Sequence, residues 1–570
     1  MEFKYRRNNR IGCFIYELIL LIFSVLLFVI SNCSFIFTKG LGFFAWFAYI
    51  PVLFLIKKAS FKTVWLWGGL YGLFSYLLYA FWLKNYDSMG LVIVLVYFFL
   101  VYSVVFEILR LEVKIWGHYS WFLECLTICA FDYIRTLGFA GLNYGIMTYT
   151  QWRYISVIQI CDLIGTFGLN FLIIFCSCLI YGVGVTYIER RQTLTKIEKN
   201  DRLYENTTHI HYINKIKNTL KSTSQLPNII AAVLYFSFMI FVLVYGHISI
   251  VDYSESPVIK VAAVQHNEDP HISGISYYNQ NLINLEKLTD EALEFHPDID
   301  IVIWPETAIV PAVVYQYNSG IDQKRFKLVD SFLSYINEKS SVFVVGNGHT
   351  IVTSYGGTKK TYNSALIFYP GKNVYPPEPE VYSKVHLVPF SEYFPYDHLF
   401  PTLNKKLMER TTLWEPGTEY KTFSYKDLKF STPICFEDNF TDTGRRMYLN
   451  GSRAFFNMSN DSWSKSDACQ YQHLAMAVIR SVENRVPSVR STTSGVTSII
   501  DPNGRVTAEI PGFCQSYVVG QIPVIPSDRP AGFYTRYGDF FGVGAVFSAV
   551  LLLIIRIILC IIRKSLINRK

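Results

Sequence analysis

Two hydrophobic patterns divide the chain. Long, nearly unbroken apolar runs fill the first 250 residues and return near the end, whereas residues 251–530 alternate short apolar runs with polar stretches. A helix needs about 20 apolar residues to cross the hydrocarbon core of a bilayer. The runs that reach or approach this length are 12–30, 41–56, 63–83, 90–109, 118–134, 157–187, 228–250 and 541–562. The pattern predicts an N-terminal membrane domain (1–250) with about seven helices and a C-terminal segment (531–570) with an eighth.

Lysine and arginine lie mainly in the segments that a cytoplasmic N-terminus would leave in the cytoplasm. Eight of them fall between Arg190 and Lys221, and four more between Arg563 and Lys570 close the chain. Because cytoplasmic loops carry an excess of positive charge, we expect both termini inside and residues 251–530 outside the cytoplasm. The first apolar run has no small-residue cleavage site and further runs follow it, so it predicts a retained span rather than a signal peptide.

Composition narrows the class of protein. The chain has 570 residues, of which 51% are apolar and 17% charged, and its net charge is +8. The positive residues flank apolar runs instead of forming one basic face, so they indicate a membrane and not a nucleic-acid partner. Eight of the 11 cysteines lie in or beside apolar runs, and no spacing of cysteine and histidine indicates zinc. We therefore expect neither a metal nor another cofactor.

The region 251–530 has the pattern of an α/β domain. Apolar runs that predict strands are 258–265, 299–304, 341–348, 363–369, 430–435, 453–459, 496–501 and 517–523. Helical patterns lie between some of them, notably at 275–295 and 472–485, and DPNGR at 501–505 is typical of a tight turn. Strands this apolar are usually covered by helices, which predicts one domain of about 270 residues.

Ionisable residues follow three of these runs. Glu306 comes after IVIWP, where we expect Pro305 to stop the strand; Lys384 precedes Glu392 by eight residues; and Cys435 follows FSTPI. Strand ends in α/β sheets are where functional side chains collect. Singly, each residue has an ordinary alternative: a solvated turn glutamate, a surface lysine or a buried cysteine.

Together these residue types predict nucleophilic chemistry. A thiol such as that of Cys435 needs deprotonation, a carboxylate such as that of Glu306 can accept the proton, and the ammonium of Lys384 can stabilise an oxyanion. His386 lies two residues from Lys384, so a Cys-His pair is an alternative arrangement.

The motifs resemble those of the nitrilase superfamily and, within it, the apolipoprotein N-acyltransferase family. They are WPETA around Glu306, KVHLVPFSEYFP with Lys384, CFED at Cys435, NMSNDSW at 457–463, the run from QHLAMAVIRSVENR to SGVTSIIDPNG, and TRYGD at 535–539. The resemblance covers essentially the whole chain. Two positions depart from it: Phe436 stands where many members have tyrosine, and Ser464 where many have an aromatic residue.

The resemblance implies a multi-pass helical membrane bundle that carries an extracytoplasmic α-β-β-α sandwich in the bacterial cytoplasmic (inner) membrane. It implies transfer of an acyl chain from a phospholipid to the α-amino group of a diacylglyceryl-cysteine on an apolipoprotein. Cys435 would be the nucleophile that forms a thioester, Glu306 the base, and Lys384 and the backbone N–H of Phe436 the oxyanion donors. Glu392 would hold Lys384, and Glu437 would be a local orienting carboxylate.

An enzyme that uses lipid needs an apolar entrance to its site. Four aromatic residues are candidates for acyl contacts: Phe390, Tyr393, Phe394 and Trp463. Because water must be kept from a thioester, the mixed segment 401–414 is a candidate mobile lid.

Two other functions fit part of the pattern. A membrane-tethered amidase of the nitrilase type would use the same three residues on a small amide, although seven preceding spans exceed what an anchor requires. A transporter or binding protein with an inactive domain would need ionisable residues in its spans, where Glu107, Glu124 and Asp132 are the main ones.

Overall fold

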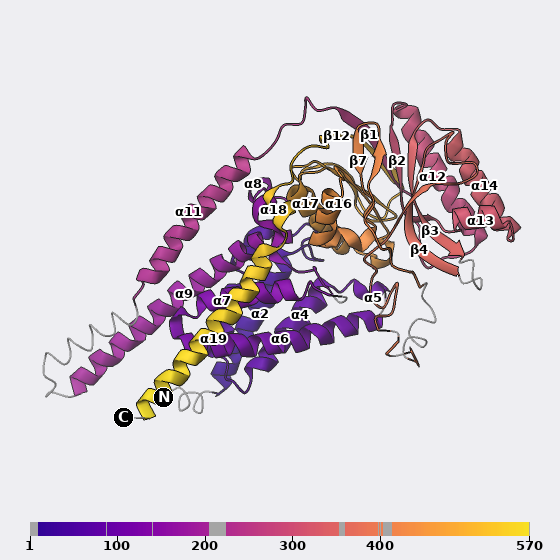
Figure 1. The fold of residues 1–570 in the computed structure, drawn as a ribbon. Helices are drawn as coiled ribbons and strands as arrows, with labels where there is room; N and C mark the ends of the chain where they lie inside the picture. Colours follow the sequence, from indigo (N-terminus) through magenta and orange to yellow (C-terminus); the bar gives the residue numbers. More distant parts are fainter. Residues whose placement is uncertain are drawn as a thin grey trace.

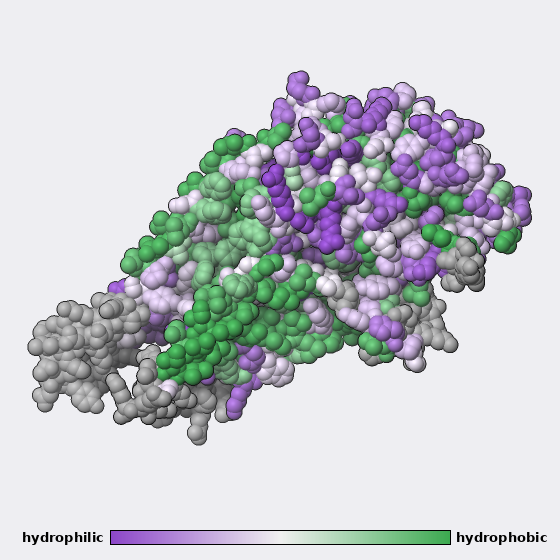
Figure 2. Space-filling model, in the orientation of Figure 1, coloured by the Kyte–Doolittle hydropathy of each residue, from purple (hydrophilic) through white to green (hydrophobic). Residues whose placement is uncertain are grey.

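The computed structural model describes residues 10–86, 88–138, 141–203, 224–352, 359–396, 398–399, 401–402 and 413–568. Helices from the first half of the chain and the last helix form an elongated bundle, and the strands gather at one end of it (Figure 1). On the face shown in Figure 2, apolar surface predominates on the described part of the bundle, whereas the part with the strands is largely hydrophilic. The predicted combination of a helical membrane part and an α/β part is confirmed.

The bundle contains helices of very different length. They are α2 (Arg10–Ser31), η1 (Gly42–Phe47), α3 (Tyr49–Lys58), α4 (Val64–Tyr79), α5 (Leu83–Tyr86), α6 (Ser88–Trp116), η2 (Gly117–Tyr119), α7 (Trp121–Ile134), η3 (Met147–Gln151), α8 (Ile155–Ile158), α9 (Cys161–Leu203), α11 (Leu226–Ile248) and α19 (Phe540–Asn568). Among the described residues, five helices are long and apolar enough to cross a membrane: α2, α6, α9, α11 and α19. The runs 41–56, 63–83 and 118–134 lie on the shorter helices α3, α4 and α7, so eight spans stay a prediction.

Helix α9 occupies the centre of the bundle. In its most apolar window 67% of the residues are buried, against 11% in α19 and 17% in α11, whose apolar side chains face outward as lipid contacts require. The helix bends at Gly165, where φ is 65°, and the ring of Tyr534 fills the space that a Cβ would take. The bend therefore makes room for Tyr534, so that the segment before α19 packs against the bundle.

The α/β part contains two sheets packed face to face. The six-stranded sheet has the order β12-β1-β2-β3-β4-β5 and the four-stranded sheet the order β11-β10-β9-β8. Their strands are β1 (Val258–Gln265), β2 (Ile301–Ile309), β3 (Val342–Val352), β4 (Lys359–Phe368), β5 (Glu380–Ser383), β8 (Phe455–Ser459), β9 (Ser488–Thr492), β10 (Thr497–Ile500), β11 (Val506–Ile510) and β12 (Ser516–Pro523); β6 (Phe423–Tyr425) and β7 (Leu428–Phe430) form a separate pair.

Successive side chains of a strand point to opposite faces of the sheet, and this alternation explains how the sheets and helices form layers. In β1, Ile259 and Val261 join the apolar core between the sheets, whereas Ala262 and Val264 join a second core. That second core is covered by α12 (Ile275–Phe295), α13 (Val313–Ser319) and α14 (Gln323–Asn337). The helices α16 (Thr441–Leu449) and α17 (Asp467–Asn484) accompany the smaller sheet. Opposite faces of one strand are thus buried in different cores, and the result is an α-β-β-α sandwich.

Two sequence-based boundaries were wrong. Strand β2 continues through Pro305 to Ile309, but its pairing with β3 shifts between Trp304 and Ile309. Because proline lacks an N–H, the residues around it leave the ladder as a bulge instead of ending the strand. The strand expected at 430–435 is regular only up to Phe430 in β7 and continues as isolated bridges. Strands β5, β6, β9 and β11 were not predicted.

Helix α17 joins the sandwich to the bundle. The Nε1 of Trp82 donates to Gln472 at 3.0 Å, and Arg485 pairs with Asp162 of α9 at 2.6 Å. The backbone N–H of Thr166, also on α9, donates to Glu483 at 2.8 Å. These buried polar contacts fix the sandwich at one end of the membrane helices.

Candidate active site

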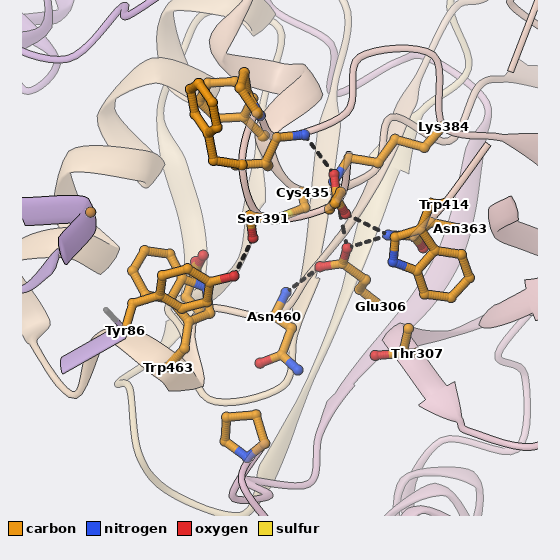
Figure 3. Close-up of a pocket in the computed structure, with 18 of the residues that line it drawn as sticks. Tyr86, Glu306, Thr307, Asn363, Lys384, Ser391, Trp414, Cys435, Asn460 and Trp463 are labelled. Carbon is orange, nitrogen blue, oxygen red and sulfur yellow. Dashed lines mark hydrogen bonds and ion pairs between the residues drawn. The ribbon is translucent and has the colours of Figure 1, made fainter. Parts of the chain in front are cut away.

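Glu306, Lys384 and Cys435, which lie far apart in the chain, converge at one cavity (Figure 3). Glu306 comes from the bulge of β2, Lys384 follows the last residue of β5, and Cys435 begins the short helix η4 (Cys435–Asn439). The Nζ of Lys384 is 3.7 Å from Oε1 of Glu306, and the Cys435 thiol interacts with the same carboxylate. A nucleophile, a proton acceptor and a cation therefore share one buried site.

Amide groups orient the Glu306 carboxylate. The Nδ2 of Asn363 donates to Oε1 at 2.7 Å, and the backbone N–H of Asn460 donates to Oε2 at 2.8 Å. The next residue, Thr307, has φ 51°, in the left-handed region that a β-branched residue rarely adopts. The bulge of β2 is thus held in an uncommon conformation that turns Glu306 toward the cavity.

Glu392 forms an ion pair with Lys384. Its Oε1 is 2.8 Å from Nζ of Lys384, and its Oε2 accepts the backbone N–H of Val388 at 2.7 Å. Asn363 also donates to Glu392, at 3.2 Å. Two carboxylates therefore balance the charge of Lys384, and Asn363 donates a hydrogen bond to each of them.

Burial and the charges of their neighbours shift the pKa values of the three groups. It raises the pKa of the Cys435 thiol, and nearby Glu306 raises it further although Lys384 opposes both. Burial also raises the pKa of Glu306, against the effect of Lys384. For Lys384 burial favours the neutral form, but Glu392, Cys435 and Glu306 outweigh it and raise the pKa. The lysine stays an ammonium, whereas the thiol keeps its proton until a base removes it.

The carboxylate of Glu437 accepts hydrogen bonds from four residues. Its Oε1 accepts the N–H groups of Val385 at 2.7 Å and His386 at 3.1 Å, and its Oε2 accepts that of Ile434 at 2.8 Å. The Tyr382 hydroxyl donates to both oxygens at 2.9 Å. Glu437 thus ties the turn before Cys435 to the chain that carries Lys384.

The alternative Cys-His pair is not formed. The ring of His386 stacks on Phe440, with centroids 4.6 Å apart, and its Nε2 forms a hydrogen bond with the Tyr420 hydroxyl at 2.9 Å. Among the described residues, Glu306 is the proton acceptor whose carboxylate interacts with the thiol.

The cavity has a volume of about 1130 Å³ and is bounded by both parts of the molecule. Membrane-side residues in its wall include Ala80, Trp82, Leu83, Ile93, Val94, Phe98 and Leu142. The opposite wall includes Glu268, Asp269, Tyr315, Arg325 and Lys359. One apolar surface of the membrane helices therefore leads to the same space as Cys435.

The four residues predicted to contact acyl chains divide into two pairs. Phe390 and Trp463 line the cavity, and the Trp463 ring lies 5.1 Å from that of Tyr86, centroid to centroid. Tyr86 also forms a hydrogen bond with Ser391 beside them (Figure 3). Tyr393 and Phe394 are not part of the lining, and Phe394 packs edge-on against Phe390 from behind. Most of the predicted lid, 403–412, lies outside the described residues.

Sequence reasoning missed the asparagines and the histidine of the site. Asn363 lies within a run interpreted as a strand, and Asn460 acts through its backbone. His473 is buried on α17 and contacts Asp438 and Asp461. Polar residues inside otherwise apolar runs were the available signal for Asn363 and His473. Within the described residues no group of three or more His, Cys, Asp or Glu is placed to hold a metal ion.

Two family models match the chain. Residues 260–524 match the family described as carbon-nitrogen hydrolase, and residues 22–179 match the apolipoprotein N-acyltransferase N-terminal domain. Apolipoprotein N-acyltransferase 1 of Treponema denticola is 33% identical over 98% of this chain and 99% of its own length. The protein of the same name from Treponema pallidum is 34% identical over 96% of each chain.

The chain belongs to the apolipoprotein N-acyltransferase family. An apolipoprotein N-acyltransferase is a membrane enzyme of lipoprotein biosynthesis, which agrees with the bundle and with the cavity that it shares with the sandwich. Proteins of known structure are similar to about half of this chain. An amidase from Nesterenkonia is 16% identical, with a TM-score of 0.34 over 50% of this chain and 98% of its own, and Nit3 of Saccharomyces cerevisiae is 18% identical, with a TM-score of 0.34 over 49% and 94%.

Proposed function

We propose that this acyltransferase takes an acyl chain from a membrane phospholipid onto Cys435 and passes it to the α-amino group of a diacylglyceryl-cysteine at the N-terminus of an apolipoprotein. The observation that carries the proposal is the convergence of Glu306, Lys384 and Cys435 at a cavity with membrane helices in its wall. Each buried methylene stabilises an acyl chain in the bilayer by about 0.8 kcal/mol, so an enzyme that uses it must meet it at the membrane.

In the first half-reaction the sulfur of Cys435 attacks the ester carbonyl of the phospholipid, and the thiol proton passes to Glu306. The ammonium of Lys384 and the N–H of Phe436 donate to the oxyanion of the tetrahedral intermediate. When the intermediate collapses, the alcohol oxygen of the lysophospholipid leaves and takes the proton from Glu306. The products are a thioester on Cys435 and a lysophospholipid.

In the second half-reaction the α-amino group of the lipoprotein attacks the thioester carbonyl, and Glu306 accepts a proton from the nitrogen. Lys384 and Phe436 donate to the oxyanion again. Collapse breaks the carbon–sulfur bond, and the sulfur of Cys435 recovers its proton from Glu306. The raised pKa of Glu306 suits a group that must hold the proton between these steps.

We also propose a bacterial cytoplasmic (inner) membrane location with both termini in the cytoplasm. The support is the arrangement of positive charges, including Arg190 and Arg191 near the end of the apolar part of α9. The cavity, which lies at the other end of the bundle, would then face the extracytoplasmic side. On the same basis we divide the chain at residues 250 and 530.

The decisive experiment is acyl transfer by the purified chain in phospholipid micelles, with a synthetic diacylglyceryl-cysteine peptide and mass spectrometry. The wild-type protein should add one acyl chain to the peptide and carry an acyl group on Cys435, whereas Cys435→Ala should do neither. Hydrolysis of small amides without acyl transfer would replace the proposal with the amidase alternative. No reaction with either substrate class would favour an inactive domain.

A further inference from the structure

Two side chains hold the carbonyl of the peptide bond between Cys435 and Phe436. The carbonyl oxygen of Cys435 lies 3.2 Å from Nε2 of His473 and accepts a hydrogen bond from Nδ2 of Asn457 at 3.3 Å. Asn457 comes from β8 and His473 from α17, so two separate elements meet at one carbonyl oxygen.

Holding this carbonyl also orients the proposed oxyanion donor. The C=O of Cys435 and the N–H of Phe436 belong to one planar trans peptide, so they point in opposite directions. The N–H of Phe436 is in the first turn of η4, where backbone N–H groups have no intrahelical partner. Phe436 lines the cavity. Donors behind the carbonyl therefore direct the opposite N–H toward the site.

The conformation of Cys435 needs such support. Its φ is 52°, in the left-handed region that costs a non-glycine residue about 1–2 kcal/mol. The Nδ2 of Asn457 also donates to the carbonyl of Pro433 at 3.2 Å. The side-chain amide of Asn457 therefore joins the residues on both sides of Ile434, in the turn that carries Cys435. Without these contacts the peptide is free to rotate toward a common conformation.

His473 is itself fixed within a buried charge network. Its Nε2 is 2.7 Å from Asp438, in η4, and its Nδ1 is 3.1 Å from Asp461. Arg490 of β9 pairs with both aspartates. Asp461 follows Asn460, whose N–H donates to Glu306. The same network thus contacts the turn of the nucleophile and the loop that orients the base.

Both ring nitrogens of His473 carry protons at neutral pH. Burial opposes the charge on the ring, and so does Arg490, but Asp438 and Asp461 outweigh them and raise the pKa to about 9. The single proton on Nε2 is then shared between Asp438, at 2.7 Å, and the carbonyl oxygen of Cys435, at 3.2 Å.

We propose that His473 and Asn457 are positioning residues that aim the N–H of Phe436 at the oxyanion by clamping the carbonyl of Cys435. The inference rests on the proposed function, because only acyl transfer through Cys435 forms that oxyanion. Both residues act through the peptide and not on the thiol, so they should affect acylation without affecting the reactivity of the sulfur itself.

The test compares two reactions of Cys435 in the full chain in phospholipid micelles. The first is acylation by phospholipid, which passes through an oxyanion. The second is alkylation by iodoacetamide, which needs the thiol and its base but forms no oxyanion. Mass spectrometry of the peptide that contains Cys435 follows both. His473→Gln keeps a donor close to the Nε2 position, whereas the shorter side chain of His473→Asn does not reach it, and His296→Asn, outside the cavity wall, is the control.

We expect His473→Asn to slow acylation by about 100-fold, in the range for loss of an oxyanion donor, and to leave alkylation within about threefold. His473→Gln should recover most of the acylation rate. Asn457→Ala should show the same selective loss, which keeps the test valid if His473→Asn does not fold. Unchanged acylation in both variants, or equal losses in the two reactions, would overturn the inference. A wild-type protein that forms no acyl-Cys435 would instead overturn the proposed function, and alkylation would still report on the thiol.

Discussion

Lys384 lies closer to Glu392 than to Glu306: its Nζ is 2.8 Å from the first carboxylate and 3.7 Å from the second. The Nδ2 of Asn363 donates to both carboxylates and so bridges them beside the same lysine. Glu392 therefore forms the closer ion pair, and in the proposed mechanism Glu306 is left to exchange its proton with Cys435.

Replacing Glu392 with glutamine should slow acylation strongly. Without its closer carboxylate, Lys384 would pair with Glu306, lower the pKa of that group and withdraw it from the thiol. Misplacement of the oxyanion donor alone costs about 100-fold in rate. The measurement is the single-turnover rate of lysophospholipid release, with Glu294→Gln on the exposed face of α12 as the control. A rate within threefold of wild type would show that Lys384 is held by other contacts.

Glu437→Gln should destabilise the protein and reduce activity together. Three backbone N–H groups and the Tyr382 hydroxyl donate to this carboxylate. In the glutamine variant the side-chain NH2 would replace one carboxylate oxygen, so some of these donors would face another donor instead of an acceptor. Each buried donor left without an acceptor costs about 1–3 kcal/mol. Thermal unfolding in detergent should give a lower Tm than for the wild type, whereas Glu338→Gln, at the end of α14, should not change it. A stable but inactive Glu437→Gln protein would instead assign Glu437 a direct chemical role.

The contribution of His473 to stability should depend on pH. Its pKa is about 9 in the folded protein, against an ordinary value of 6.5, so the folded state holds a proton that the unfolded state releases between these values. The stabilisation is full below pH 6.5, about 3 kcal/mol, and is lost as the pH rises through 9. The groups that face the ring are Asp438, Asp461 and Arg490.

The measurement is the Tm of the wild type and of His473→Gln from pH 6 to 9.5. The difference between them should be largest at the acidic end and should shrink toward pH 9. A difference that stays constant over this range would mean that the ring is neutral in the folded protein.

The apolar side of the cavity should limit the length of the acyl chain. Ile93 of α6 lines it, and a larger side chain there would occupy part of the space. Loss of room for about three methylene groups costs about 2.4 kcal/mol, or about 50-fold in kcat/KM. Ile93→Trp should therefore discriminate against long-chain phospholipids but not against short-chain ones. Ile229→Trp, on the outward face of α11, is the matched control. Equal effects on both chain lengths would place the acyl chain elsewhere.

The sequence predicted the residues of this site better than their surroundings. Glu306, Lys384 and Cys435 follow apolar runs and lie in recognisable motifs, and the helix expected at 275–295 has the same ends as α12. The partners of these residues depend on contacts between segments far apart in the chain. Asn363 reaches Glu306 only because β4 pairs between β3 and β5, which no local pattern specifies.

Loop residues were the least predictable part. Phe390, Tyr393 and Phe394 form one aromatic stretch, yet only Phe390 lines the cavity. Its φ of 61° turns the chain sharply, and a composition rich in aromatics does not reveal such a turn. Pro305 was expected to stop β2 because proline removes a ladder hydrogen bond, but the chain resumed pairing at Ile309 after a bulge.

The polar contacts of α17 have a consequence for how the enzyme is made. Arg485 pairs with Asp162 of α9, and apolar side chains of α17 belong to the core of the bundle, so a fragment limited to the sandwich would lack this ion pair and would expose that apolar face to water. Ribosomes deliver α9 long before α17, and α17 in turn supplies the histidine behind Cys435. The thiol site is therefore assembled last, on helices already in the membrane, and a chain that fails to insert acquires no acylating centre.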